Sequence, residues 1–294
     1  MPLEQLWAEL GNDVQGMLGT FRGRLADLNV TEKNDRTLLT EADTAIQDMI
    51  VERIRGYEPD AHIVAEELGG EQWRSGSDPL PERVWVIDPI DGTAQFVQDD
   101  KIEYCSVVVA LEDLEPAHAL VVAPELGAGR SPLVLTASRA DRTVTVNGVP
   151  AQVNRGDAAR RAASVTRSGG TQPRHFERAM RAAGYSLKTR TTSQTLDMVR
   201  TALDLSDVTD EPVRFDLFFR PEQKIWDGLA GLCFGAATGM ANADLSGSPR
   251  VPVSPDILAQ SEPTFSSTVM GFPEAVTWFV KIAEGYPTGA ARSS

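Results

Sequence analysis

The segment from Trp85 to Thr93 limits the possible folds of this chain more than any other part of it. Its sequence, WVIDPIDGT, begins with an apolar run that predicts a buried strand ending near Asp88. Asp91 follows on a tight turn. Two carboxylates three positions apart on such a turn converge on one point, which suits a hard divalent cation. The alternative is an ordinary turn, because Asp-Pro and Asp-Gly steps are common between strands.

The Gly92-Thr93 step adds a second chemical feature to this segment. A short helix that begins there would present backbone N–H groups to an anion such as phosphate. Metal-binding carboxylates beside an anion site indicate metal-assisted phosphate-ester chemistry, although short motifs of this kind also occur by chance.

Two other acidic positions strengthen that interpretation. Residues 61–65 predict a short strand that ends at Glu66 and Glu67, and Asp227 begins an apolar helix that runs to about Met240. The dipole of that helix favours an anion at its start. Each residue taken alone is an ordinary strand-end or first-turn charge, but together they indicate one acidic site assembled from separate segments.

Composition indicates a globular protein and argues against one class of partner. A length of 294 residues suffices for one large domain or two closely packed halves, and 41% hydrophobic residues exclude a disordered chain. The net charge of −14 argues against a nucleic-acid polymer as partner, since such polymers are held mainly by basic surfaces. A small phosphorylated substrate is compatible with this charge, because bound cations reverse the local field.

The sequence also predicts a cellular compartment. No apolar run reaches the length of a membrane span, and the first residues lack the pattern of a secretion signal. Cys105 and Cys233, the two cysteines, lie in apolar stretches, which predicts buried free thiols in a reducing environment. We therefore expect a cytoplasmic protein with no membrane partner.

Periodicity and turn residues predict the order of the elements. We expect helices over 3–28, 40–56, 173–184, 194–204, 226–240 and 273–285, and strands over 62–65, 84–88, 104–112, 118–123, 133–137, 143–146, 163–166, 186–190 and 214–219. Thr40 is the expected N-cap of its helix, and Asn147-Gly148 predicts a tight turn. The alternation of the second half predicts helices layered on sheets. We expect an N-terminal half over 1–155, with most of the metal ligands, and a C-terminal half over 156–294.

Several ordered motifs carry a resemblance to a known family. E-E at 66–67, W-V-I-D-P-I-D-G-T at 85–93 and W-D-G-L-A-G at 226–231 resemble the inositol monophosphatase family of magnesium-dependent, lithium-sensitive phosphatases. Thr40-Glu-Ala-Asp43 is similar to the family's T-x-x-D signature. The resemblance implies a layered α-β-α-β-α sandwich of the inositol monophosphatase and fructose-1,6-bisphosphatase type, with its site between the two halves.

The resemblance also implies a role for each site residue. Two to three Mg²⁺ ions would be held by Glu66, Asp88, Asp91, Asp227 and the backbone carbonyl of Ile90. Thr93, oriented by Asp43, would take the proton of a metal-activated water, and Glu66 would belong to the catalytic set. The N–H groups of Gly92, Thr93 and Ala94 would bind the phosphate, and Asp227 would also contact the substrate. The implied assembly is a homodimer, for which apolar residues of the strands over 104–123 are candidates.

Departures from the family pattern leave the substrate open. Ala94-Gln-Phe follows the D-G-T motif, and Ser193-Gln194 replaces the Gly-Ser pair that commonly precedes the next helix. The stretch around D-G-T is closer to the inositol and histidinol phosphate branches, which favours a sugar-like, inositol or amino-alcohol monophosphate.

Three alternatives to that substrate class stay open. Gln223-Lys-Ile-Trp-Asp227 is similar to 3′(2′),5′-bisphosphate nucleotidases, and a second phosphate would give a role to the basic residues between 155 and 190. Most of those residues are otherwise expected on a solvated helix face. A specialised biosynthetic phosphatase is the second alternative. A non-catalytic relative that only binds a phosphorylated ligand is the third, although no expected metal ligand is missing.

Overall fold

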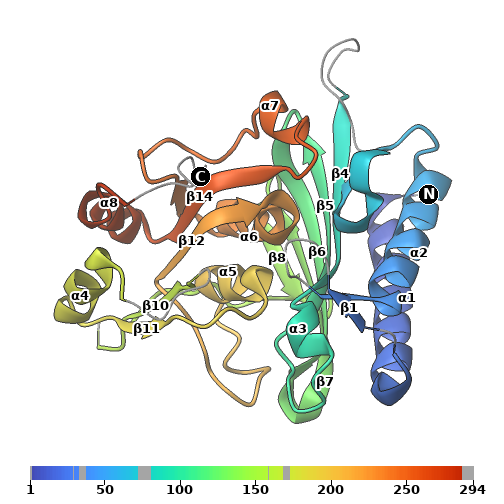
Figure 1. Ribbon diagram of the computed structural model, residues 1–294, viewed down its shortest axis with the longest axis horizontal. Helices are drawn as coiled ribbons and strands as arrows, with labels where there is room; N and C mark the ends of the chain where they lie inside the picture. Colours follow the sequence, from blue (N-terminus) through green and yellow to red (C-terminus); the bar gives the residue numbers. More distant parts are fainter. Residues whose placement is uncertain are drawn as a thin grey trace.

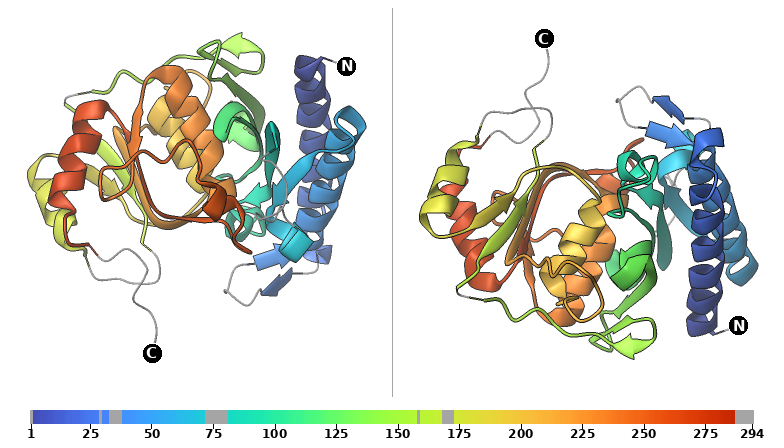
Figure 2. Two further views of the ribbon diagram at one scale, coloured as in Figure 1. Left: turned by 90° about the horizontal axis from the view of Figure 1, so that it is seen from above. Right: turned by 90° about the horizontal axis from the view of Figure 1, so that it is seen from below.

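The computed structural model describes residues 2–28, 30–32, 38–71, 81–157, 159–167 and 173–286. In this part of the chain, two large β-sheets alternate with three layers of helices, as Figures 1 and 2 show. The order from one face of the molecule to the other is helix, sheet, helix, sheet, helix. The predicted α-β-α-β-α sandwich is therefore confirmed.

The larger sheet contains seven strands in the order β3-β4-β5-β6-β7-β8-β9. β3 and β4 pair in parallel, and the other neighbours are antiparallel. Its strands are β3 (His62–Ala65), β4 (Arg83–Asp91), β5 (Cys105–Glu112), β6 (Glu115–Gly127), β7 (Ser131–Ser138), β8 (Thr143–Val146) and β9 (Val149–Pro150). Between β8 and β9, Asn147 and Gly148 both have positive φ, as the predicted tight turn requires.

The smaller sheet contains five strands in the order β11-β10-β12-β14-β13. β10 pairs in parallel with β11 and β12, whereas β14 pairs antiparallel with β12 and β13. Its strands are β10 (Ala162–Val165), β11 (Ser186–Lys188), β12 (Leu217–Lys224), β13 (Ala241–Ala243) and β14 (Thr264–Gly271).

The helices form the three remaining layers. One outer layer is α1 (Leu3–Arg22) with α2 (Glu41–Tyr57), the central layer is α5 (Gln194–Ala202) with α6 (Ile225–Thr238), and the other outer layer is α4 (His175–Ala182) with α8 (Pro273–Ile282). Smaller elements are α3 (Thr93–Phe96), α7 (Pro255–Leu258) and the paired strands β1 (Val30–Glu32) and β2 (Leu38–Thr40).

Side-chain alternation along the strands creates the hydrophobic cores between these layers. On β4, Trp85 packs with α1 and α2, whereas Val86 belongs to the central core around α5 and α6. On β12, Phe218 belongs to that same central core, whereas Phe219 packs with α4 and α8. Successive side chains of a strand point to opposite faces of the sheet, so a strand with helices on both faces contributes to two cores. The central core is therefore built from both sheets.

The expected boundary at residues 155 and 156 falls between the two sheets. The larger sheet ends at Pro150 and the smaller sheet begins at Ala162. Because the two sheets share the central core, the division of the chain into two domains stays a prediction.

The structure differs from the predicted elements in several places, and the strand predicted over 214–219 lies over Leu217–Lys224 (β12). The first helix ends at Arg22 rather than at residue 28, because Gly23 follows and a short 3₁₀ turn over Leu25–Asp27 replaces the last predicted turn. β1, β2, β9 and α7 are absent from the predicted elements, and so are β13 and β14. Their extended conformation depends on pairing with β12 and with each other, which local sequence patterns do not encode.

The expected contribution of the strands over 104–123 to a dimer surface is also wrong. β5 and β6 lie in the middle of the larger sheet, and helices on both faces bury nearly all of their residues. The homodimer itself stays a prediction.

Two sequence predictions about the chain as a whole can be compared with the structure. Cys105 and Cys233 are both buried and free, as predicted. Among the residues described above, no helix is long and apolar enough to cross a membrane. The cytoplasmic location stays a prediction.

Candidate metal centre

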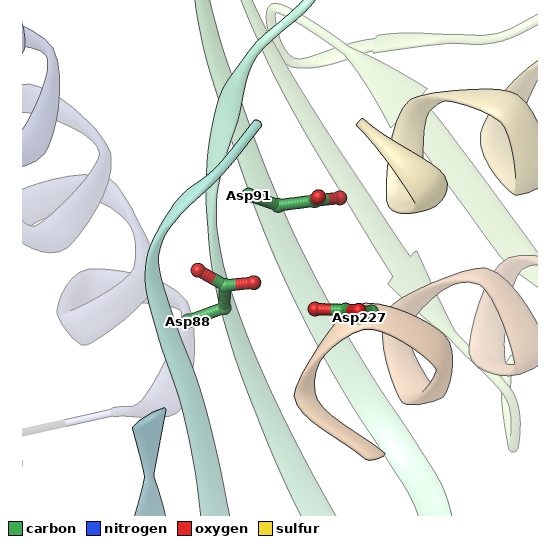
Figure 3. Close-up of side chains that lie close together, drawn as sticks. All are labelled: Asp88, Asp91 and Asp227. Carbon is green, nitrogen blue, oxygen red and sulfur yellow. The ribbon is translucent and has the colours of Figure 1, made fainter. Parts of the chain in front are cut away.

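Three aspartates come together where the end of β4 meets the start of α6. Each of Asp88, Asp91 and Asp227 offers a carboxylate oxygen, and these oxygens lie within 4.8 Å of one another. Figure 3 shows the three side chains pointing toward one another, two from the end of β4 and one from the first turn of α6. The structure thus brings together three carboxylates that the sequence singles out, and their roles as ligands stay predictions.

An irregularity at the end of β4 directs two of these carboxylates to the same place. β4 pairs regularly with β5 as far as Asp88, and the register shifts between Asp88 and Asp91. Residues three positions apart in a regular strand point to opposite faces, so the shift is required for both side chains to converge. Gly92 follows with a φ of 94°, where a Cβ would lie 2.9 Å from the carbonyl oxygen of Glu103.

Asp88 is the most deeply buried of the three aspartates, and no hydrogen-bond donor of the described residues reaches its carboxylate. It is 1% exposed, and neither carboxylate oxygen has a hydrogen-bond partner in the described structure. Burial raises its pKa well above the usual range, and the negative charges of Glu66, Asp91 and Asp227 raise it further. A buried ionised carboxylate requires a compensating cation. A divalent cation would supply both the charge and the partner for these oxygens.

The N-terminus of α5 holds Asp91 in position. The hydroxyl of Ser193 and the N–H of Thr195 both donate to Oδ2 of Asp91 at 2.7 Å. The N–H of Gln194 donates to Oδ1 at 3.2 Å. Burial raises the pKa of Asp91, and these three hydrogen bonds offset part of the increase. The carboxylate is therefore fixed in one orientation before any cation binds.

Gln194 also connects α5 to Asp227. Its Nε2 donates to Oδ2 of Asp227, and its Oε1 accepts a hydrogen bond from Nε2 of Gln223 at 3.3 Å. The hydroxyl of Thr195 donates to the backbone carbonyl of Asp227 at 3.0 Å. Burial, followed by the charge of Asp91, raises the pKa of Asp227 well above its usual range. One helix terminus thus orients two of the three aspartates.

These contacts of α5 are not predicted from the sequence, which marks Ser193-Gln194 only as a departure from a family pattern. A signal for the helix start does exist, because Ser193 is an N-cap whose hydroxyl accepts from the N–H of Leu196 at 3.0 Å. What the sequence does not show is that this helix start lies against Asp91.

Glu66 lies beside the three aspartates. β3 pairs in parallel with β4 so that Ala65 is opposite Ile87, which places the next residue, Glu66, alongside Asp88. Its charge adds to the effect of burial in raising the pKa of Asp88 and Asp227. It does not belong to the group of oxygens within 4.8 Å of one another, so its roles in metal binding and catalysis stay predictions.

Thr93 and Asp43, the predicted proton-transfer pair, lie next to each other. The hydroxyl of Thr93 donates to the carbonyl of Ile90 at 3.0 Å and lies 3.4 Å from Oδ1 of Asp43. Asp43 is fully buried, and its Oδ2 accepts from the N–H and hydroxyl of Thr40 at 2.8 and 2.6 Å. Thr40 caps α2 as predicted, so the capping interaction also fixes the Asp43 carboxylate.

A short helix begins directly after the acidic segment. Gly92 is the N-cap of α3, and the N–H groups of Thr93 and Ala94 lie in its first turn, where a helix provides no acceptor. Ala94 is exposed, so this helix start is open to solvent. These N–H groups lie where the sequence analysis expects an anion.

The basic cluster between residues 155 and 190 divides into two groups. Arg167 and Arg174 share the buried carboxylate of Glu177, and Nζ of Lys188 lies 2.6 Å from Oδ1 of Asp197. The others are exposed, as expected for a solvated face: Arg155, Arg160, Arg161, Arg178, Arg181 and Arg190.

Comparison with known proteins agrees with these observations. A family model described as the inositol monophosphatase family matches residues 4–271. A histidinol-phosphatase of Mycobacterium tuberculosis is 34% identical over 100 residues, which cover 34% of this chain and 36% of that protein. A 3′(2′),5′-bisphosphate nucleotidase CysQ of Aggregatibacter actinomycetemcomitans is 34% identical over 106 residues, again 36% of its length. A Nus factor SuhB of Xylella fastidiosa is 29% identical over 227 residues, which cover 76% of this chain and 75% of that protein.

Solved structures show the same fold. The extragenic suppressor protein suhB of Bartonella henselae superposes with a TM-score of 0.73 and 15% identity, covering 98% of this chain and all of that one (100%). An IMPase of Thermotoga maritima superposes with a TM-score of 0.71 and 24% identity, covering 96% of each chain.

Proposed function

The chain belongs to the inositol monophosphatase family, and on that premise we propose that it is a magnesium-dependent phosphatase that hydrolyses a small phosphorylated metabolite. The observation that carries the proposal is the buried Asp88 carboxylate, which has no hydrogen-bond partner in the described structure and lies against Asp91 and Asp227. Mg²⁺ prefers oxygen ligands of this kind.

We propose that the site holds two to three Mg²⁺ ions. Asp88, Asp91 and Asp227 would hold them, together with Glu66 and the carbonyl of Ile90. When bound, the ions would lower the pKa of a coordinated water and neutralise charge on the phosphate. The hydrogen bonds from α5 to Asp91 and Asp227 would keep these ligands oriented, as supporting partners do around other metal sites.

Thr93 would move the proton of the attacking water. Its hydroxyl can accept that proton while it donates its own to Oδ1 of Asp43, which lies 3.4 Å away. The capping bonds from Thr40 leave Oδ1 of Asp43 directed toward Thr93 because they engage Oδ2.

The start of α3 would bind the phosphate. The N–H groups of Gly92, Thr93 and Ala94 would donate to it, because a helix start favours an anion and Gly92 is the N-cap of α3. Asp227 would contact the substrate in addition to its role as a ligand.

The proposed substrate is a sugar-like, inositol or amino-alcohol monophosphate, which agrees with the histidinol-phosphatase among the relatives. A nucleotide such as adenosine 3′,5′-bisphosphate is the second candidate, since a relative is a bisphosphate nucleotidase. A nucleic-acid polymer is not proposed as a partner despite the Nus factor SuhB relative, because the net charge is −14.

Phosphate release tests the proposal. We expect Mg²⁺-dependent release from at least one of inositol 1-phosphate, histidinol phosphate, adenosine 3′,5′-bisphosphate and simple nucleoside monophosphates, and its loss in EDTA. Weak EDTA-sensitive activity on all of them would indicate a specialised biosynthetic substrate. If no phosphate is released from any of them and Mg²⁺ does not change the melting temperature, the protein is better explained as a non-catalytic family member that only binds its ligand.

Thr93 provides a second, more specific test. We expect Thr93→Ala to lower kcat by about 10²-fold or more, because general acid–base groups contribute on that order. Thr93→Ser keeps the hydroxyl and should retain most of the activity. Equal activity of the two variants would exclude a role for this hydroxyl in proton transfer.

A further inference from the structure

A cavity of about 440 Å³ lies between the start of α8 and strand ends of the smaller sheet, on the side of the molecule away from α1 and α2 (Figure 1). Its lining includes Asp216, which precedes β12, and Phe272, which follows β14. Asp227 follows the other end of β12, and this strand of eight residues spans roughly 25 Å at about 3.3 Å for each residue. The cavity is therefore separate from the metal centre, and its volume is in the range of small-molecule sites.

Three aromatic side chains give the cavity a flat apolar surface. The rings of Tyr185 and Trp278 stack with 5.5 Å between their centroids and an interplanar angle of 9°. Phe272 belongs to the same lining. Tyr185 is buried, whereas Trp278 and Phe272 are half-buried. Parallel aromatic rings of this kind form a surface on which another planar ring can stack.

Two arginines in the lining are available to an anion. Arg155 and Arg161 are exposed, and neither guanidinium forms a hydrogen bond or an ion pair with a described residue. Cζ of Arg161 lies 5.8 Å from the centroid of the Tyr185 ring, so one cation lies next to the aromatic surface. Gly156 has a φ of 71°, and a Cβ there would lie 3.1 Å from Cε2 of Phe272. The backbone next to Arg155 therefore packs directly on an aromatic ring of the cavity.

The carboxylates of the cavity differ in how they are bonded. Asp157 pairs with Arg214 at 3.3 Å, so its charge is balanced within the protein. Oδ2 of Asp216 accepts from the N–H of Ala162 at 2.9 Å, whereas Oδ1 has no donor among the described residues. Burial raises the pKa of Asp216, and the N–H of Ala162 offsets part of the increase. Glu274 is exposed. The cavity thus presents two carboxylates as well as two arginines, so its ligand needs hydrogen-bond donors in addition to an anionic group.

We propose that this cavity is a second ligand site, which binds a nucleoside phosphate away from the metal centre. The base would stack on the aromatic surface of Tyr185 and Trp278. Arg155 and Arg161 would bind the phosphate through their forks of N–H donors. Oδ1 of Asp216 would accept a hydrogen bond from a sugar hydroxyl or a base amine. This site requires no metal ion, and it does not depend on the proposed hydrolysis.

Titration calorimetry in EDTA tests the site without turnover. Adenosine, guanosine, cytidine and uridine 5′-monophosphates are titrated first, and the tightest binder is compared with its own nucleoside and with ribose 5-phosphate. We expect the nucleotide to bind about tenfold or more tightly than either fragment, because the phosphate and the base each contribute on that order. If none of the four nucleotides binds, or if ribose 5-phosphate binds as tightly as the nucleotide, the inference is wrong.

Variants of the lining show where the nucleotide binds. Arg161→Gln should weaken nucleotide binding by about ten- to a hundredfold and leave the affinity for the nucleoside unchanged, because only the phosphate loses a charged partner. Trp278→Leu should weaken both by about tenfold or more, and Trp278→Phe should retain most of the affinity, since it keeps a ring.

Arg178→Gln is the matched control, since it removes an exposed arginine of α4 that does not line the cavity. It should bind the nucleotide as wild type does. Melting temperatures verify that each variant is folded, and Arg161→Gln changes an exposed position where folding should be preserved. If Arg161→Gln and Trp278→Leu both bind the nucleotide with wild-type affinity, the nucleotide binds elsewhere and the stacked rings have only a packing role.

Discussion

At the scale of single residues, Asp88 has the least favourable electrostatic environment of the three aspartates. Three other carboxylates raise its pKa in addition to burial, and no donor among the described residues relieves it. Proteins usually provide partners for buried polar groups, so exceptions of this kind mark sites of function.

We therefore predict opposite effects of Asp88→Asn with and without metal. In EDTA, the variant should melt no lower than wild type, because one of several mutually repelling charges is removed. In Mg²⁺, it should lose the metal-induced rise in melting temperature, and phosphate release should fall by more than about 100-fold. Thermal unfolding and phosphate release measure the two effects.

Asp48→Asn is the control, because it makes the same chemical change on an exposed position of α2. It should retain the response to Mg²⁺. An Asp88→Asn variant that melts at higher temperature in Mg²⁺, as wild type is expected to do, would show that this carboxylate is not a ligand.

At the scale of elements, helix starts position the charged groups. The cap of α2 fixes Asp43, the start of α5 orients Asp91 and Asp227, and α4 begins with a capping interaction at Glu177. Each helix has unpaired N–H groups at its first turn, so each start is a natural partner for a carboxylate.

Ser193→Ala should have both a structural and a functional effect. Loss of the cap of α5 should cost about 1 kcal/mol of the free energy of unfolding. Loss of the hydrogen bond to Asp91 should also weaken Mg²⁺ binding by about tenfold or more. Calorimetric titration of Mg²⁺ and denaturant unfolding measure the two.

Ser254→Ala is the matched control, because Ser254 caps α7 by accepting from the N–H of Asp256 and has no hydrogen bond to the three aspartates of the site. Its effect should be limited to stability. If both variants bind Mg²⁺ as wild type does, the contact between Ser193 and Asp91 has no role in orienting a ligand.

Glu177 allows a prediction of pH dependence. Burial acts to raise its pKa, but hydrogen bonds from Arg167 and Arg174 outweigh burial and lower the pKa from 4.5 to about 2. A lowered folded-state pKa stabilises the protein above pH 4.5, and this contribution is lost as the pH falls toward 2. Glu177→Gln should thus lower the free energy of unfolding by on the order of 2–3 kcal/mol at pH 7 and by progressively less below pH 4.5.

Urea unfolding of wild type and Glu177→Gln at pH 7 and pH 3 measures this difference. Glu262→Gln serves as the control, since Glu262 pairs with Lys224 at an exposed position and should contribute under about 1 kcal/mol. A difference between wild type and Glu177→Gln that does not depend on pH would contradict the low pKa.

At the scale of the whole molecule, the central helix layer determines where the two acidic segments meet. The first turns of α5 and α6 lie at the aspartates, and the two helices pack closely, so that a Cβ on Gly231 would lie 2.3 Å from Cβ of Met198. Close packing between these helices therefore sets the position of Asp227 relative to Asp91.

Gly231→Ala should separate the two helices. We expect a loss of about 1–3 kcal/mol in the free energy of unfolding, as for other overpacked cores, together with weaker Mg²⁺ binding. Gly16→Ala on α1 is the matched control, because a Cβ there meets no atom within 4 Å and should stabilise the helix by up to about 1 kcal/mol. Unchanged Mg²⁺ affinity in Gly231→Ala would show that the helix spacing does not control the site.

The sequence by itself determined the local features of this protein. The buried strand before Asp88, the cap at Thr40, the tight turn at Asn147 and the apolar helix after Asp227 all follow from periodicity and turn chemistry over a few residues. The ordered motifs added the family and, through it, the layered fold.

Only the tertiary structure decided which of these features meet. The register shift in β4 and the contact of Ser193 with Asp91 depend on pairing and packing between segments distant in sequence. The same is true of β14, which is extended because β12 and β13 pair with it on either side. Such contacts arise from the hydrophobic burial of whole layers rather than from local conformational preference. They therefore leave no local pattern in a single sequence from which they could be predicted.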